Sequence, residues 1–157
     1  MGKVFYLSGS SLIQLGPAFS GTNIVTDLSI SFNSLGEEYV AYTDASNGNK
    51  STVKKWDGVS SWLSVGTGTV SSGAGYYNSL VIDNTDTPVL AYQSIANSSV
   101  TAVSKFNGSW VPVGTGTVGL GAANSKIKVA SNGDYYLGYT ELSGKIIVHK
   151  YNGTWDR

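Results

Sequence analysis

The sequence predicts an all-β protein built from an internal repeat, and three observations lead to this prediction. A lysine, an aromatic residue, Asp or Asn, and a glycine follow one another at residues 55–58, 105–108 and 150–153. A tryptophan lies just beyond each copy, at Trp62, Trp110 and Trp155. Apolar residues form short alternating runs without a helical period, separated by stretches rich in Gly, Ser, Thr and Asn. Self-similarity at a period of roughly 40 to 50 residues is typical of repeat arrays.

Composition restricts the classes of partner. The 157 residues are 41% hydrophobic, which is enough for the core of one domain. Ten Lys and Arg residues balance ten Asp and Glu residues without clustering, so we expect no nucleic-acid or membrane-surface partner. No apolar run approaches the ~20 residues that span a bilayer, and no signal peptide is recognisable. The localisation is therefore unknown, and association with a cell surface or a virion stays open. The chain has no cysteine, so neither a disulfide nor a thiolate metal site is expected.

Aligning the copies gives four strand-like runs in each repeat. The first is short and rich in branched residues, and a turn of Asn, Asp, Ser or Gly residues follows it. The second has a small residue before an aligned tyrosine, the third ends in the [Asp/Asn]-Gly turn, and the fourth begins at the tryptophan. The first three runs are expected at 28–32, 39–44 and 52–56, then at 79–82, 89–94 and 101–106, then at 126–129, 136–141 and 146–151.

The fourth run covers residues 62–66 and 110–114, and Pro112 within it indicates an edge strand, where a missing N–H costs nothing. Four antiparallel strands followed by a crossing to the next sheet form a β-propeller blade. We therefore expect a single domain over residues 1–157. It would contain an incomplete blade at 3–16 and blades at about 17–66, 67–114 and 115–157.

The two ends of the chain suggest assembly. Residues 4–9 and 12–16 are a degraded copy of a third and fourth strand, with Leu12 at the tryptophan position. Closed propellers need about 4 to 8 blades, so three cannot close a ring. We predict a six-bladed homodimer in which the strand from Leu12 to Leu15 completes the last blade of the partner. A longer repeat protein, of which this chain is a piece, is the alternative. Simple closure has one difficulty, because residues 4–7 and 146–151 are copies of the same strand.

The repeat resembles those of bacterial and phage β-propellers, including lectin propellers. The likeness lies in the tyrosine of the second strand, the Lys-aromatic-[Asp/Asn]-Gly turn and the Trp-x-x-Val-Gly segment, and it covers residues 3–157. It implies the propeller fold and makes carbohydrate binding one of several functions that the scaffold hosts. The Asn-Gly-x-Trp turn also resembles the Asp-box turns of sialidases, but it lacks the Ser-x-Asp-x-Gly spacing, so nothing catalytic is carried over.

Candidate ligand-binding residues lie in the loops that precede each first strand. These loops place Asp27, Asn78 and Asn124 at aligned positions, with Tyr76 and Tyr77 beside one of them. An Asx side chain next to an exposed aromatic ring is the minimum that sugar recognition needs. The repeated tryptophans could also stack on sugars, but a large residue fixed in every copy is better explained by packing between blades. The repeated lysines are expected to be solvated surface charges.

The sequence shows no catalytic constellation. His149, the single histidine, follows the pattern of a strand residue, and no nucleophile has a visible base. The turn at 83–86 offers oxygen ligands for Ca²⁺ but lacks the spacing of a calcium loop, and a hairpin turn explains the same residues. We expect no metal and no cofactor.

Two functions of different classes follow. The first is a non-enzymatic module that binds glycans through repeated shallow sites on an oligomeric propeller, where multivalency would strengthen weak binding. The alternative is a structural or protein-interaction propeller without a small ligand. A hydrolase is a distant third reading.

Overall fold

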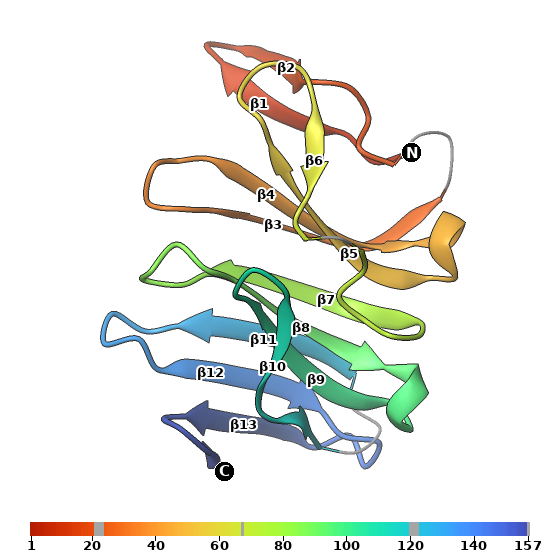
Figure 1. The fold of residues 1–157 in the computed structure, drawn as a ribbon, viewed down its shortest axis with the longest axis vertical. Coiled ribbons are helices and arrows are strands. Elements are labelled where there is room, and N and C mark those ends of the chain that lie inside the picture. Colours follow the sequence, from red (N-terminus) through yellow and green to blue (C-terminus); the bar gives the residue numbers. More distant parts are fainter. Residues whose placement is uncertain (21–23, 67, 120–122, 157) are drawn as a thin grey trace.

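The chain forms a stack of antiparallel sheets. The computed structural model describes residues 1–20, 24–66, 68–119 and 123–156. Three sheets have four strands, in the orders β3-β4-β5-β6, β7-β8-β9-β10 and β11-β12-β13-β14, and β1 and β2 form a two-stranded sheet. Below, the three sheets are blades 1, 2 and 3, and the β1–β2 sheet is the N-terminal hairpin. Figure 1 shows them stacked in sequence order, with the hairpin at one end and blade 3 at the other.

Each blade repeats the same strand order. The hairpin consists of β1 Val4–Ser8 and β2 Ser11–Leu15, and blade 1 of β3 Val25–Phe32, β4 Glu38–Asp44, β5 Lys50–Trp56 and β6 Trp62–Ser64. Blade 2 consists of β7 Gly75–Ile82, β8 Pro88–Ser94, β9 Val100–Phe106 and β10 Trp110–Val118. Blade 3 consists of β11 Ala123–Val129, β12 Tyr135–Thr140, β13 Ile146–Tyr151 and β14 Trp155–Asp156. The all-β fold of four-stranded antiparallel blades is therefore confirmed, and Pro112 lies in the edge strand β10 as predicted.

The first strand of every blade begins earlier than predicted, because it contains a bulge. The pairing register shifts between Thr26 and Ser29 in β3, and at the equivalent places in β7 and β11. At each bulge one non-glycine residue adopts a left-handed conformation: Asp27 with φ 52°, Tyr77 with φ 53° and Asn124 with φ 54°. A bulge interrupts the two-residue alternation, which hides this part of the strand from a sequence pattern.

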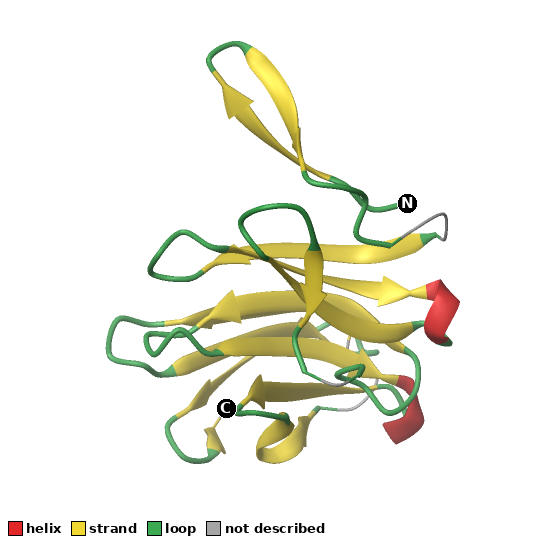
Figure 2. Ribbon diagram, turned by 45° about the horizontal axis from the view of Figure 1, so that its top comes forward, coloured by secondary structure: helices red, strands yellow, loops and turns green. Residues whose placement is uncertain are grey.

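The N-terminal hairpin has the structure of the outer half of a blade, as its sequence predicted. Leu7 pairs with Leu12 in the hairpin, just as Trp56 pairs with Trp62 in blade 1. The hydrogen bond from Phe19 N to the Gly2 carbonyl (2.9 Å) corresponds to the bond from Val70 N to the Ser51 carbonyl (2.8 Å) in blade 1. Figure 2 shows the hairpin projecting from the stack.

The core lies between the blades. One cluster joins Ala41 and Val53 of blade 1 to Leu80 and Leu90 of blade 2, and a second joins blades 2 and 3. A third joins the hairpin segment to blade 1. Burial of these branched side chains is the main force that holds the stack together.

The repeated tryptophans pack between blades, in agreement with the sequence analysis. Trp110 Nε1 donates to the Val65 carbonyl of the preceding blade (2.9 Å), and Trp155 Nε1 repeats this bond one blade later (3.0 Å). Gly66, which follows Val65, has φ +88°, and a Cβ there would lie 3.0 Å from the Phe106 ring. The Val-Gly pair of the motif therefore accommodates the aromatic pair of the next blade.

Two short 3-10 helices, which the sequence analysis did not anticipate, connect the second and third strands: η1 Ala45–Asn47 in blade 1 and η2 Ile95–Asn97 in blade 2. Asp44 caps η1 by accepting a hydrogen bond from Ser46 N (3.0 Å). Within the described residues, no helix is long and apolar enough to cross a membrane.

Candidate functional site

The predicted binding residues lie within the first strands, at the bulges, and not in loops. The strand registers make Asp27, Tyr77 and Asn124 equivalent to one another. Asn78 is equivalent to Leu28 and is therefore one position out of the predicted alignment. The sequence comparison matched Asx residues by type, whereas the backbone conformation of the bulge defines the true correspondence.

Asn78 is part of a buried polar contact between blades. Its Nδ2 donates to Thr43 Oγ1 of blade 1 (3.0 Å), and Thr43 Oγ1 lies 2.7 Å from the Gly75 carbonyl and 3.3 Å from Asp27 Oδ2. Two of the five predicted residues, Asp27 and Asn78, are thus brought together through Thr43. Asn78 is only 2% exposed, so its position suits the joining of blades better than contact with a ligand.

The other three predicted residues are separated from this contact. Tyr77 is 37% exposed, and its carbonyl accepts a hydrogen bond from Ser125 Oγ of blade 3 (2.8 Å). Tyr76 is half-buried and Asn124 is exposed. Asp27, Tyr77 and Asn78 therefore take part in contacts with neighbouring strands or blades, and the five predicted residues do not converge on one cavity.

A pocket of about 430 Å³ lies on blade 1, beside the segment that follows the hairpin. The segment contributes Phe19 and Ser20, the strands β4 and β5 contribute Tyr42, Asp44, Thr52 and Lys54, and η1 contributes Ser46 and Asn47. The remaining lining residues are Ser64, Gly66, Gly68 and Thr69. Hydroxyl groups, an amide, a carboxylate and an ammonium group thus surround one space.

One of the residues that line this pocket, Thr52, carries a buried hydroxyl group without a partner among the described residues. Thr52 as a whole is only 6% exposed. Buried hydroxyls without partners are rare, because the lost hydration is not replaced. The neighbouring Tyr42 Oη donates to the Phe19 carbonyl (3.4 Å). Burial, followed by the charge of Asp44, raises the pKa of the Tyr42 phenol, which therefore remains a donor.

The sequence analysis missed this pocket, although a signal for it exists. Thr52 and Lys54 occupy the strand positions that Ala102 and Ser104 occupy in blade 2. In blade 2 these positions are buried, whereas Lys54 of blade 1 is half-exposed. Lys54 is larger than Ser104, its equivalent in blade 2, which indicates that this face of blade 1 is less covered than that of blade 2. Recognising the signal requires the exact alignment of the two strands.

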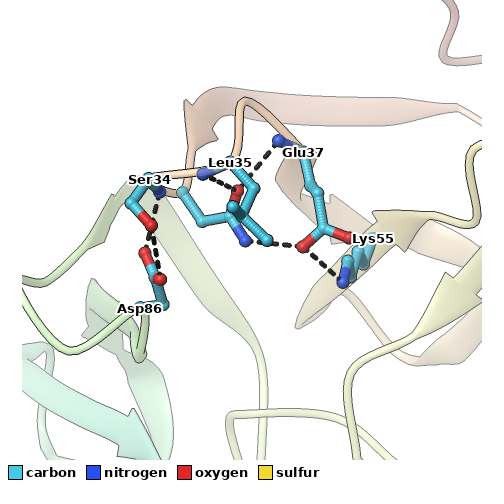
Figure 3. Close-up of polar contacts among 6 residues, drawn as sticks. Ser34, Leu35, Glu37, Lys55 and Asp86 are labelled. Carbon is cyan, nitrogen blue, oxygen red and sulfur yellow. Dashed lines mark hydrogen bonds and ion pairs between the residues drawn. The ribbon is translucent and has the colours of Figure 1, made fainter.

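The turn between β7 and β8 holds blade 2 to both of its neighbours. Asp86 accepts hydrogen bonds from Ser34 N (2.8 Å) and Ser34 Oγ (2.6 Å) of blade 1, as Figure 3 shows. Asp83 Oδ2 accepts from Tyr135 Oη of blade 3 (2.8 Å), and Asn84 Nδ2 donates to the Ala130 carbonyl (3.1 Å). Protein donors thus occupy carboxylate oxygens that had suggested calcium. Among the residues described, no three His, Asp or Glu side chains gather in a metal-binding group.

Two of the three repeated lysines form ion pairs within their blades. Lys55 Nζ lies 2.7 Å from Glu37 Oε2 (Figure 3), and Lys150 Nζ lies 2.7 Å from Asp134 Oδ2. The hydrogen bond between Lys55 and Glu37 lowers the pKa of the carboxyl group and raises the pKa of the ammonium group. These lysines are exposed enough for solvent to screen the pairs. They are surface charges, as expected, although each has a defined partner.

His149 stacks on a tyrosine of the adjacent strand. Its ring lies 5.6 Å from that of Tyr139 with an interplanar angle of 7°, and its Nε2 is 3.0 Å from Tyr139 Oη. This contact gives the histidine a packing role between the two strands.

Comparisons with known proteins show likeness in fold. No protein-family model matches the sequence, and no curated protein matches it. The chain is similar to a polysaccharide lyase described as a family PL25 ulvan lyase, with a TM-score of 0.57 and 13% identity over 80% of this chain and 35% of that one. A thermostable family-43 glycoside hydrolase gives a TM-score of 0.56 and 13% identity over 82% of this chain and 48% of that one.

An endo-1,4-β-xylanase from Bacteroides thetaiotaomicron VPI-5482 gives a TM-score of 0.53 and 13% identity over 99% of this chain and 70% of that one. The chain thus spans between about a third and a half of the lyase and the family-43 hydrolase. The blades are folded as in proteins that act on carbohydrates. At this identity the likeness concerns the fold alone.

Proposed function

We propose that the protein is a non-enzymatic carbohydrate-binding module whose site is the pocket on blade 1. The observation that carries the proposal is the buried Thr52 hydroxyl without a partner, on a residue that lines a pocket together with hydroxyl, amide, carboxylate and ammonium groups. A sugar presents adjacent hydroxyls that donate and accept at once, so it satisfies Thr52 Oγ1, Asn47 and Lys54 together. Such convergent polar groups in a concave site are typical of small-ligand recognition.

Binding without turnover is supported by the charges around the pocket. Glycoside hydrolysis generally uses two carboxyl groups about 5 to 10 Å apart, on either side of the scissile bond. Among the described residues that line this pocket, Asp44 is the one carboxylate, and its Oδ1 already accepts hydrogen bonds from Ser46. The fold of the carbohydrate-active neighbours gives the proposal a second, weaker support.

The test is a glycan array followed by calorimetric titration of the best oligosaccharide. We expect Asn47→Ala and Lys54→Met to weaken binding at least tenfold. The matched control is Asn97→Ala, because Asn97 occupies in η2 the place that Asn47 occupies in η1. No binding at millimolar sugar, or equal losses from Asn47→Ala and Asn97→Ala, would contradict the proposed site.

Thr52→Val separates the role of the hydroxyl from that of the fold. The two side chains have nearly the same shape, and the hydroxyl has no partner in the protein, so thermal stability should stay the same or rise. Sugar affinity should fall. Release of shorter oligosaccharides from the bound sugar during prolonged incubation would show that the protein is an enzyme and contradict the proposal.

A protein-interaction role is the second candidate, and one observation favours it: the apolar side chains of Leu28, Ile30 and Phe32 in β3 are exposed to solvent. The ring closed by a second copy of the chain remains a prediction.

A further inference from the structure

On the face of blade 1 that points toward the hairpin, the strands β4 and β5 are covered, whereas β3 is not. Val4 and Phe19 pack on Val40, Tyr42 and Trp56. Three apolar side chains of β3 are open to solvent: Leu28 is 52% exposed, Ile30 45% and Phe32 55%. These three side chains lie along the first strand of blade 1 and form an apolar patch, which we call the β3 patch.

The repeat positions of Ile30 and Phe32 are buried or partly buried in the other two blades. Ile30 corresponds to Leu80 and Ile127, which are 4% and 1% exposed, and Phe32 corresponds to Ile82, which is 8% exposed. What covers them is the inner pair of strands of the preceding blade: Tyr39 and Ala41 of β4 for blade 2, and Val89 and Ala91 of β8 for blade 3. The structure itself thus shows which kind of element fits the β3 patch.

The strand β1 of the N-terminal hairpin has a free edge. Its equivalents β5, β9 and β13 each pair on both sides, whereas β1 pairs with β2 alone in the part of the chain that the structure describes. A free edge presents unpaired N–H and C=O groups that can accept a further strand. The free edge belongs to the N-terminal hairpin, which lies at the top of Figure 1, and the β3 patch belongs to the face of blade 1 that points toward this hairpin.

We propose that the free edge of β1 and the β3 patch form a docking site for an antiparallel β-hairpin of a partner protein, which pairs with the edge and covers the patch. Pairing with the edge supplies backbone hydrogen bonds, and the patch selects the side chains. The proposal is independent of carbohydrate binding, which uses the pocket beside β4 and β5.

The repeated contacts of the stack define the chemistry of the docking hairpin. Ser29 Oγ accepts a hydrogen bond from Leu80 N of the next blade (3.0 Å), and Ser79 Oγ accepts one from Ile127 N (3.1 Å). The N–H group of Ile30 occupies the equivalent place in blade 1. The partner hairpin therefore carries a serine facing Ile30, with small or branched uncharged residues at its neighbouring inward positions.

A second copy of the chain fits this site less well. The far face of blade 3 has Lys126 where blade 2 has Ser79, and Lys128 where blade 2 has Val81. Both lysines are exposed. Placing that face on the β3 patch would bury two ammonium groups against apolar side chains and provide no serine acceptor, which is costly.

The experiment uses the full chain and a synthetic peptide of residues 75–94, which is the inner hairpin of blade 2. The control peptide has the blade 3 residues at two positions, Ser79→Lys and Val81→Lys. Fluorescence anisotropy of the labelled peptides should show saturable binding of the first and at least tenfold weaker binding of the second. In the protein, Phe32→Lys should weaken binding of the first peptide at least tenfold, while Val148→Lys, an exposed apolar position on the far face of blade 3, should leave it unchanged.

The proposal is overturned if the first peptide does not bind at millimolar concentration, if both peptides bind alike, or if Phe32→Lys and Val148→Lys have the same effect. Phe32 is exposed, so its replacement should not unfold the chain, and an unchanged thermal transition checks this. Light scattering of the protein alone supplies the remaining test. A doubled mass that Phe32→Lys returns to the mass of one chain would show that a second copy occupies the site and would overturn the proposal.

Discussion

Replacement of Tyr135 by phenylalanine removes a single hydrogen bond between blades 2 and 3. Tyr135 Oη donates to Asp83 Oδ2 over 2.8 Å, while its ring packs in the cluster between the two blades. The change leaves the ring in place, so the loss concerns the hydroxyl alone. A hydrogen bond to a charged group contributes about 1.5–3 kcal/mol. Asp83 is partly exposed, so water compensates for part of the loss, and we expect Tyr135→Phe to lower the free energy of unfolding by about 1–1.5 kcal/mol.

Urea unfolding at neutral pH measures this loss, as a lower midpoint with an unchanged slope. The same change in an Asp83→Ala background completes a double-mutant cycle, and there Tyr135→Phe should cost much less, because the acceptor is gone. A loss of the same size in both backgrounds would refute the assignment of the energy to this bond.

The pH dependence gives an independent check. Burial raises the pKa of Asp83, but hydrogen bonds from Thr85, Tyr135 and backbone groups outweigh it and hold the pKa below its usual value. A carboxyl group with a lowered folded pKa stabilises the fold above its unfolded pKa of about 3.9, and this stabilisation is lost as the pH falls through the folded value. The difference between the native chain and Tyr135→Phe should therefore be largest at neutral pH and shrink below about pH 4. A difference that stays constant into the acid range would contradict this reasoning.

Two further changes test the contacts that repeat along the stack. Ser79→Ala should lower the free energy of unfolding by about 1–3 kcal/mol in urea titration, because the N–H of Ile127 loses its acceptor in a buried place. Gly66→Ala should cost more than Gly58→Ala in thermal unfolding. Both glycines have positive φ, +88° and +80°, but a Cβ at Gly66 meets Phe106 at 3.0 Å, whereas nothing lies within 4 Å of one at Gly58. Equal losses at the two glycines would show that backbone conformation, and not the contact with the next blade, requires the glycine of the motif.

The parts of the fold that the sequence predicted well are those with strong, regular signals. The second and third strands pair with each other without a register shift, and their predicted and observed ranges differ by at most two residues. Pro112 correctly indicated the edge strand, and Leu12 correctly marked the degraded copy, because proline geometry and repeat register act locally. The packing role of the tryptophans followed from their repetition. Each of these inferences needed only residue type and spacing.

The candidate site was not predictable in the same way, because it depends on the backbone conformation of the first strands and on how completely neighbouring segments cover each blade. The sequence matched Asn78 with Asp27 and Asn124 by residue type, whereas Tyr77 occupies that place in the bulge of blade 2, and no residue type marks the bulge. The pocket depends on Thr52 and Lys54 at positions that are covered in blade 2 but partly open in blade 1. A linear sequence records which residues repeat, but it does not record which copies have a neighbour.

The two ends of the stack differ in chemistry, and this difference bears on how the protein assembles. At the hairpin end, Ile30 and Phe32 keep the apolar character of buried repeat positions while lying exposed. At the other end, Lys126 and Lys128 replace the residues that form contacts between blades elsewhere. A head-to-tail ring of two chains would bring these two faces together, so it requires the lysine side chains to turn aside toward solvent. The proposed hairpin at the β3 patch requires no such rearrangement, because its contacts with Ile30 would be of the kind that Leu80 makes with blade 1 and Ile127 makes with blade 2.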